Sequence, residues 1–185
     1  MTPAEFTEYW NKSDKPSLNK FRLTSPLASG LSSACVSALK EYGLPDAAGW
    51  LEFGETNDFS KSVTDALDER NLFPIGRVGA SGFICIDKSS GAVVIYDQDD
   101  PDELWLMNSS LEQLYESIMI FDVFNSGINA QNPDYHRNYK IPDGMLNGLK
   151  NKLTECDPVA MAGKSYWCCE VSALDDSFAT HLTAL

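Results

Sequence analysis

The chain has 185 residues with 27 acidic and 14 basic side chains, which gives a formal net charge of −13. A length in this range favours a single domain, and 11% aromatic residues argue against a disordered chain. Because nucleic-acid binders neutralise phosphates with lysine and arginine, we expect no direct binding to nucleic acid or to an anionic membrane.

The N-terminal segment predicts one short helix followed by an irregular connection up to about residue 30. Thr2 and Glu5 have the spacing of a capping box, and Pro3 stands at the first helical position. The segment lacks the basic stretch and apolar run of a secretory signal, and no part of the chain is apolar enough for a membrane helix. We therefore expect a cytoplasmic protein.

A second helix is predicted where apolar residues recur on one helical face, from Leu31 to Tyr42. Gly43 follows as a stop signal, since glycine readily adopts the left-handed conformation that ends many helices. Residues 50–53 have the character of a short strand. The stretch 54–70 is polar, and one helical turn is expected around Val63 to Leu67.

Strands dominate the next part of the chain. Four segments have strand character: 72–78, 82–87, 92–96 and 103–107. Pro74 in the first of them indicates an edge strand or an irregular one, because proline cannot donate to a neighbouring strand. Residues 88–91 form a four-residue hairpin link that ends in glycine. The short connections predict an antiparallel meander.

Helices resume after the last strand. Ser109 and Glu112 have capping-box spacing, and a strongly apolar stretch follows from Leu111 to Phe124, as expected of a largely covered helix. Residues 125–142, rich in Asn, Gly, Pro and Tyr, predict a long loop. Two further helices are expected around 145–153 and 166–171, followed by a C-terminal tail.

The negative charge is concentrated in the second half of the chain. Residues 1–92 carry a net charge of −3 and residues 93–185 a net charge of −10, so we expect one acidic face. Five carboxylates crowd the loop before the last strand: Asp97, Asp99, Asp100, Asp102 and Glu103. An EF-hand needs glycine and glutamate where this loop places Asp102 and Asn108, which excludes that calcium motif. Two interpretations stay open, a solvated acidic turn and a contact patch for lysine and arginine of a partner.

Other candidate motifs carry little chemistry. The glycines of 76–82 are spaced GxxGxxG and precede a strand, whereas a dinucleotide loop needs GxGxxG before a helix. Asp134 and His136 suggest acid–base chemistry, but no nucleophile can be tied to them. A small enzyme that uses His136 and a cysteine is a further hypothesis. We expect the Asp134–His136 stretch to be an aromatic loop over the sheet.

The five cysteines indicate no metal site. Their odd number fits a reducing compartment. Cys35 and Cys85 lie in apolar patterns and are expected to be buried. Cys168 and Cys169 are adjacent, but the chain has no CxxC pattern and only two histidines, so we expect neither zinc nor another cofactor.

Four short stretches, in this order and spacing, are similar to the SUKH superfamily, in particular to its fourth immunity-protein group. They are Tyr42-Gly43-Leu44-Pro45, Ile75-Gly76 leading into the 82–87 strand and Gly91, Leu106 to Leu111, and Cys156-Asp157-Pro158 with Tyr166-Trp167. The resemblance spans roughly residues 30–172. Cys156 departs from the pattern, which has an isoleucine-like residue there.

The resemblance implies an α+β fold, with a central antiparallel meander sheet flanked by helices. The expected organisation is a single SUKH-like domain over 1–185, with an extension (1–30), a core (31–172) and a tail (173–185). The resemblance also implies a bacterial immunity protein that binds and neutralises a cognate toxin, often a nuclease or nucleic-acid deaminase. An adaptor module with a non-toxin partner is the alternative. None of the quoted stretches contains a catalytic residue, so we expect no enzyme.

The expected partner is therefore a protein toxin with a basic surface. If so, Asp97, Asp99, Asp100, Asp102 and Glu103 are the candidate binding residues, because carboxylates complement a surface built to hold phosphates.

Overall fold

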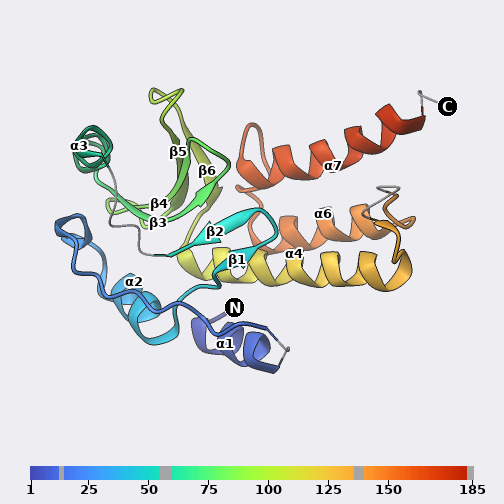
Figure 1. The fold of residues 1–185 in the computed structure, drawn as a ribbon, viewed down its shortest axis with the longest axis horizontal. Coiled ribbons are helices and arrows are strands. Elements are labelled where there is room, and N and C mark those ends of the chain that lie inside the picture. The colour runs from blue at the N-terminus through green and yellow to red at the C-terminus, as the bar shows by residue number, and fades with distance from the viewer. Residues whose placement is uncertain (13–14, 55–59, 136–139, 183–185) are drawn as a thin grey trace.

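The computed structural model describes residues 1–12, 15–54, 60–135 and 140–182, with side chains through Asp175. These residues form an α+β fold around a six-stranded antiparallel sheet (Figure 1). The strands are β1 (Ala47–Ala48), β2 (Leu51–Phe53), β3 (Leu72–Val78), β4 (Gly82–Asp87), β5 (Val93–Asp97) and β6 (Leu104–Asn108). The helices are α1 (Pro3–Lys12), α2 (Ser33–Ser37), α3 (Lys61–Glu69), α4 (Leu111–Gln131), α6 (Met145–Cys156) and α7 (Tyr166–Leu182), with the short turns η1 (Pro26–Ala28) and η2 (Ala38–Tyr42).

The sheet is the predicted meander, because its strands follow one another in chain order from β1 to β6. β3 pairs with β2 on one side and with β4 on the other, so the option of an edge strand is wrong for β3, although the β2 pairing covers only Gly76–Val78 and does not reach Pro74. The option of an irregular strand is confirmed, since the β3–β4 register shifts between Pro74 and Gly76. A bulge of this kind accommodates the missing proline N–H inside a sheet. β6 forms one edge of the sheet.

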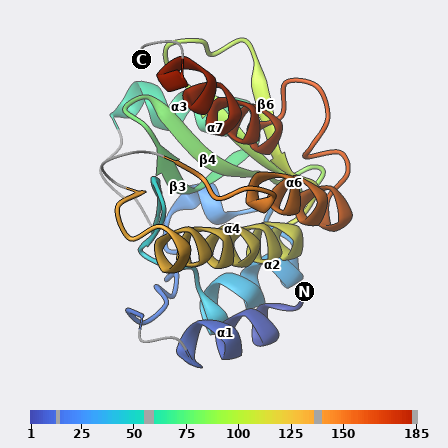
Figure 2. The same cartoon turned by 90° about the vertical axis from the view of Figure 1, so that its right-hand side faces the viewer.

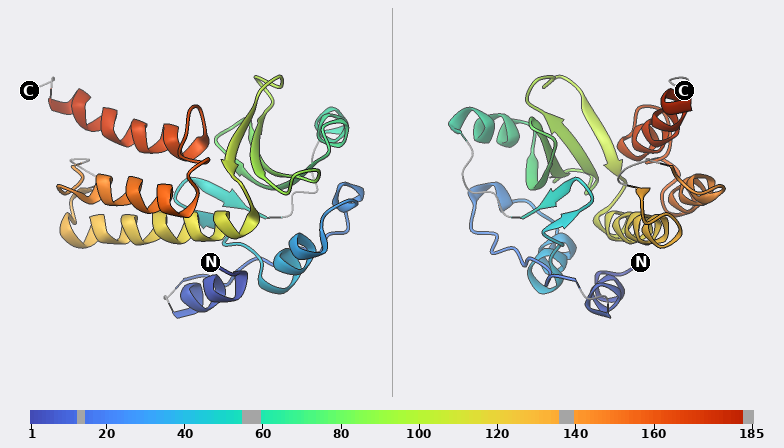
Figure 3. Two further views of the ribbon diagram at one scale, coloured as in Figure 1. Left: turned by 180° about the vertical axis from the view of Figure 1, so that it is seen from behind. Right: turned by 45° about the vertical axis from the view of Figure 1, so that its right-hand side comes forward.

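Helices cover both sides of the sheet. α3 packs against β3, whereas the start of α7 contacts β6, and the two helices lie on opposite sides of the strands (Figures 1 and 3). α4, α6 and α7 form a stack in which α6 lies between its two neighbours (Figure 2). No helix among the described residues has both the length and the apolar composition needed to cross a membrane.

The N-terminal helix is part of the core. The predicted capping box forms, because Thr2 N donates to Glu5 at 2.7 Å and Glu5 N donates to the Thr2 hydroxyl at 3.3 Å. Phe6 is fully buried, with its ring 4.9 Å from that of Tyr115 on α4. The Tyr9 hydroxyl donates to Asp122 at 2.5 Å. α1 is therefore anchored to α4 by both apolar and polar contacts.

The structure corrects the extent of three helices. α4 continues to Gln131, through the first residues of the predicted long loop, because Ile128 is buried and α4 packs along α6. Tertiary packing thus outweighs the weak helix propensity of this stretch. α7 continues to Leu182 through most of the predicted tail, and α3 runs from Lys61 to Glu69, beyond the one turn expected around Val63 to Leu67.

Candidate functional site

The third and fourth stretches of the family pattern meet in one buried polar network. Asn108 at the end of β6, Asp157 after α6 and Trp167 on α7 are each at most 1% exposed. The Trp167 indole N–H donates to the Asn108 side-chain oxygen at 3.0 Å. The Asn108 amide group donates to Ser117 at 3.0 Å and to Asp157 at 3.3 Å. One asparagine thereby joins the edge strand to three helical regions.

Asp157 holds the junction between β6 and α4. Its carboxylate accepts from Ser109 N at 2.7 Å, from the Ser109 hydroxyl at 2.9 Å and from Ala160 N at 3.3 Å. Because its hydroxyl is used here, Ser109 does not cap the helix, which corrects the predicted capping box. Ser110 is the N-cap and accepts from Gln113 N.

Close backbone contacts require glycine at one position in each of the first two stretches, Gly43 and Gly76. Gly43 has φ +79°, and a Cβ there would lie 2.1 Å from the Asn19 carbonyl oxygen. A Cβ on Gly76 would lie 2.3 Å from the Glu52 carbonyl oxygen. The Tyr115 hydroxyl donates to the Gly43 carbonyl at 2.8 Å. These stretches build the fold, so the surface that acts on a partner must be sought elsewhere.

The acidic loop, residues 97–103 between β5 and β6, projects from the sheet at the end away from α1 and α4 (Figures 1 and 3). Asp97 is half-buried, and its side chain accepts from Asp99 N at 3.0 Å, which fixes the first turn of the loop. The other four predicted residues are exposed: Asp99, Asp100, Asp102 and Glu103. The loop therefore presents its carboxylates to solvent.

Two cations approach this loop without neutralising it. Arg70 lies 3.9 Å from Asp102, whose side chain is 99% exposed, and Lys164 lies 3.8 Å from Glu103. Exposed pairs at such distances contribute little, about 0–1 kcal/mol. Within the described part of the chain, no ion pair reaches Asp99 or Asp100.

Exposed apolar side chains adjoin the acidic loop. Leu104 and Trp105, at the start of β6, are each 38% exposed, and Val159 is exposed beside them. A groove of about 340 Å³ separates the β6 edge from the turn that carries Val159 and Lys164. Exposed aromatic and aliphatic residues beside charged ones are typical of a protein-binding surface.

A second groove, of about 290 Å³, opens on the other side of Trp105 (the α7 groove hereafter). The β3–β4 turn, the face of β5 and β6, and the first turns of α7 line it. It holds two aromatic side chains, Trp105 and Tyr166, and two carboxylates, Asp97 and Glu170. Burial raises the pKa of Glu170, an effect that hydrogen bonding to the Tyr166 hydroxyl partly opposes.

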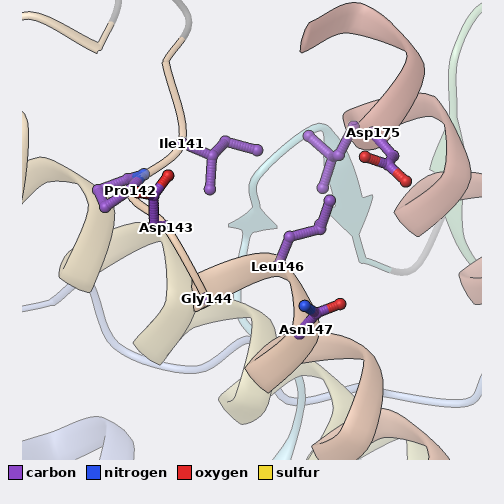
Figure 4. Close-up of a pocket in the computed structure, with 8 residues that line it drawn as sticks. Ile141, Pro142, Asp143, Gly144, Leu146, Asn147 and Asp175 are labelled. Atoms are coloured by element: carbon purple, nitrogen blue, oxygen red, sulfur yellow. The ribbon is translucent and has the colours of Figure 1, made fainter. Parts of the chain in front are cut away.

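A smaller cavity of about 170 Å³ lies where the start of α6 faces α7 (Figure 4). Figure 4 shows Asp143 and Asp175 on opposite sides of the apolar Ile141 and Leu146. The two carboxylates are thus separated and do not form a paired acid–base site.

Metal-ligand clusters and the two buried cysteines bear on the chemistry that the sequence left open. No cluster of three histidine, cysteine or acidic side chains among them has the geometry to hold a metal ion. Cys35 and Cys85 are buried, as predicted, and burial raises the pKa of the Cys85 thiol, which disfavours the reactive thiolate. His136, the proposed acid–base residue, lies outside the described residues.

The sequence indicated the acidic loop but not its apolar and acidic neighbours. Trp105 was predicted only as part of a strand, and strand alternation alone does not say whether its ring is covered. Glu170 belongs to a helix far along the chain, and no local pattern could place it beside Asp97.

A family model described as SUKH-4 immunity protein matches residues 29–171. Comparison with curated proteins and with solved structures gave no match. The matched range contains the four stretches quoted above, including the Asn108–Asp157–Trp167 network. Because this match extends over most of the chain, the chain belongs to the SUKH-4 immunity protein family.

Proposed function

We propose that this chain protects its cell by binding a cognate toxin in a stoichiometric complex, and that the acidic loop is part of the binding surface. Membership of an immunity-protein family supports the neutralising role. The observation that carries the choice of surface is the exposed run of carboxylates beside Leu104 and Trp105 at the free edge of the sheet.

The charge of the loop favours a toxin that acts on nucleic acid, such as a nuclease or a nucleic-acid deaminase. Such enzymes hold phosphates with lysine and arginine, so their substrate-binding surfaces are basic. Exposed carboxylates attract a basic surface over a distance, which speeds encounter and rejects partners of the wrong charge. Occupation of that surface by Asp99, Asp100 and their neighbours then competes directly with the substrate.

The test is co-expression with the toxin encoded beside the gene for this chain. Toxin expressed alone is expected to stop growth, whereas cells that also express this chain survive. The chain is also expected to co-purify with the toxin in a fixed ratio. A catalytically inactive toxin is the matched control, because its complex should form equally well. Binding without protection would favour an adaptor role, and protection without binding would contradict the proposal.

A further inference from the structure

The α7 groove has features that the proposed acidic-loop surface does not need. It lies directly beside the loop and shares Asp97 with it, yet its walls are aromatic and its second carboxylate comes from α7. We propose that the α7 groove is an anchor site for one arginine side chain that the toxin presents. This inference rests on the proposed function and names the partner group that one part of the surface recognises.

The size of the groove suits a side chain. Pockets for cofactors and drug-sized ligands usually span ~300–1,000 Å³, and this groove, at about 290 Å³, lies at the lower limit. Val78 on β3 and Ile95 on β5 provide apolar lining, against which the methylene stem of an arginine can pack. The end of such a side chain then lies among Trp105, Asp97 and Glu170.

The two carboxylates lack a cation. Among the described residues, no ion pair is made by Asp97 or Glu170, although both line the groove. Glu170 is half-buried, so its negative charge is partly removed from water, and hydrogen bonding to the neutral Tyr166 hydroxyl offsets only part of this cost. The raised pKa of Glu170 reflects this cost. A guanidinium group placed between the two acids would compensate both charges.

The aromatic walls favour arginine over lysine. A guanidinium is planar and can stack on the Trp105 indole while its N–H groups reach carboxylates at its edge. Tyr166 is held in place, because the Trp50 indole N–H donates to its hydroxyl at 2.7 Å and Trp50 itself packs edge-on against Phe121 at 5.2 Å. The Tyr166 wall of the groove is therefore preformed in the unbound chain.

The first test uses N-acetyl-arginine amide as the probe, in an NMR titration of the isotope-labelled chain. The uncharged control is the citrulline counterpart, which keeps the shape and loses the cation. The arginine probe is expected to shift the Trp105 indole N–H and the Ser81 amide signals, and citrulline is not. The double variant D97N/E170Q should abolish the shifts. Absence of shifts, or equal shifts with both probes, would overturn the assignment.

The second test measures toxin affinity in two variants that each remove one negative charge. Glu170→Gln changes the groove, whereas Asp99→Asn changes an exposed loop residue that does not line it. We expect Glu170→Gln to weaken binding at least about 10-fold and Asp99→Asn no more than about 3-fold. The reason is that a desolvated charge pair contributes more to affinity than an exposed one. If both variants weaken binding equally, the groove assignment fails while the proposed function stands. If the wild-type chain binds no toxin, the proposed function fails, whatever the arginine probe shows.

Discussion

Removal of the Asp157 carboxylate tests whether the family pattern around it is structural. In Asp157→Ala, the Ser109 and Ala160 N–H groups lose the oxygen atoms that they contact at 2.7 and 3.3 Å. Neither has another hydrogen-bond partner among the described residues, whereas the Asn108 amide keeps Ser117. Each orphaned N–H costs about 1–3 kcal/mol, so we expect the free energy of unfolding to fall by about 3–5 kcal/mol.

The assay is urea unfolding followed by tryptophan fluorescence and circular dichroism. A loss of this size is a large share of the ~5–15 kcal/mol that stabilises a typical domain. Asp143→Ala is the matched control, because Asp143 is exposed, and its effect should stay within about 0.5 kcal/mol. A loss below about 1 kcal/mol in Asp157→Ala would refute the assigned role of the carboxylate.

Three further predictions concern stability. Gly43→Ala should lower the free energy of unfolding by more than about 3 kcal/mol, because its Cβ meets the Asn19 carbonyl. Gly91 has the same φ of +79° but open space around it, so Gly91→Ala should cost only about 1–2 kcal/mol. Equal losses of stability in thermal unfolding would contradict the role of the Asn19 contact. Tyr115→Phe leaves the buried Gly43 carbonyl unpaired, so the free energy of unfolding measured in urea should fall by about 1–2 kcal/mol. Unchanged stability would contradict this role of the hydroxyl. Glu170→Gln addresses pH. Because the folded-state pKa of Glu170 is raised, its charge opposes folding once the pH passes the ordinary value. The stability gained by the glutamine variant should therefore vanish in acid, grow between the ordinary and the raised pKa, and stay constant above it. A pH-independent difference would contradict this expectation.

The sheet was predictable from the sequence because a meander is built from local pairings. The hairpin link at 88–91 and the alternating strands around it determine the neighbour of each strand without reference to distant residues. β1 was not predicted, because a strand of only two residues, Ala47–Ala48, is too short to show a periodic pattern in the sequence. The end of α4 was missed for a different reason, since only contact with α6 makes a helix of the Asn-Ser-Gly stretch after Phe124.

The candidate site was predictable only where it is contiguous in the chain. Five acids within one loop are visible in the sequence, and the exposure of four of them is what their charge predicts, whereas the half-burial of Asp97 is not. The α7 groove is assembled from five elements, β3, β4, β5, β6 and α7, so the meeting of Trp105 with Glu170 depends on how α7 docks against β6. The same docking brings Trp167 into hydrogen-bond contact with Asn108, although the two residues are far apart in the sequence.

The most direct test of the central claim is the salt dependence of toxin affinity for the wild-type chain and for one variant of the acidic loop. In this variant Asn replaces Asp97, Asp99, Asp100 and Asp102, and Gln replaces Glu103. We expect the wild-type affinity to fall steeply as sodium chloride rises, because salt screens the attraction between the loop and a basic surface. The variant should bind more weakly at low salt and show a flatter dependence, with its unfolding free energy nearly unchanged. Equal affinity and equal salt slope for the two proteins would contradict the assignment of the acidic loop as the toxin-binding surface.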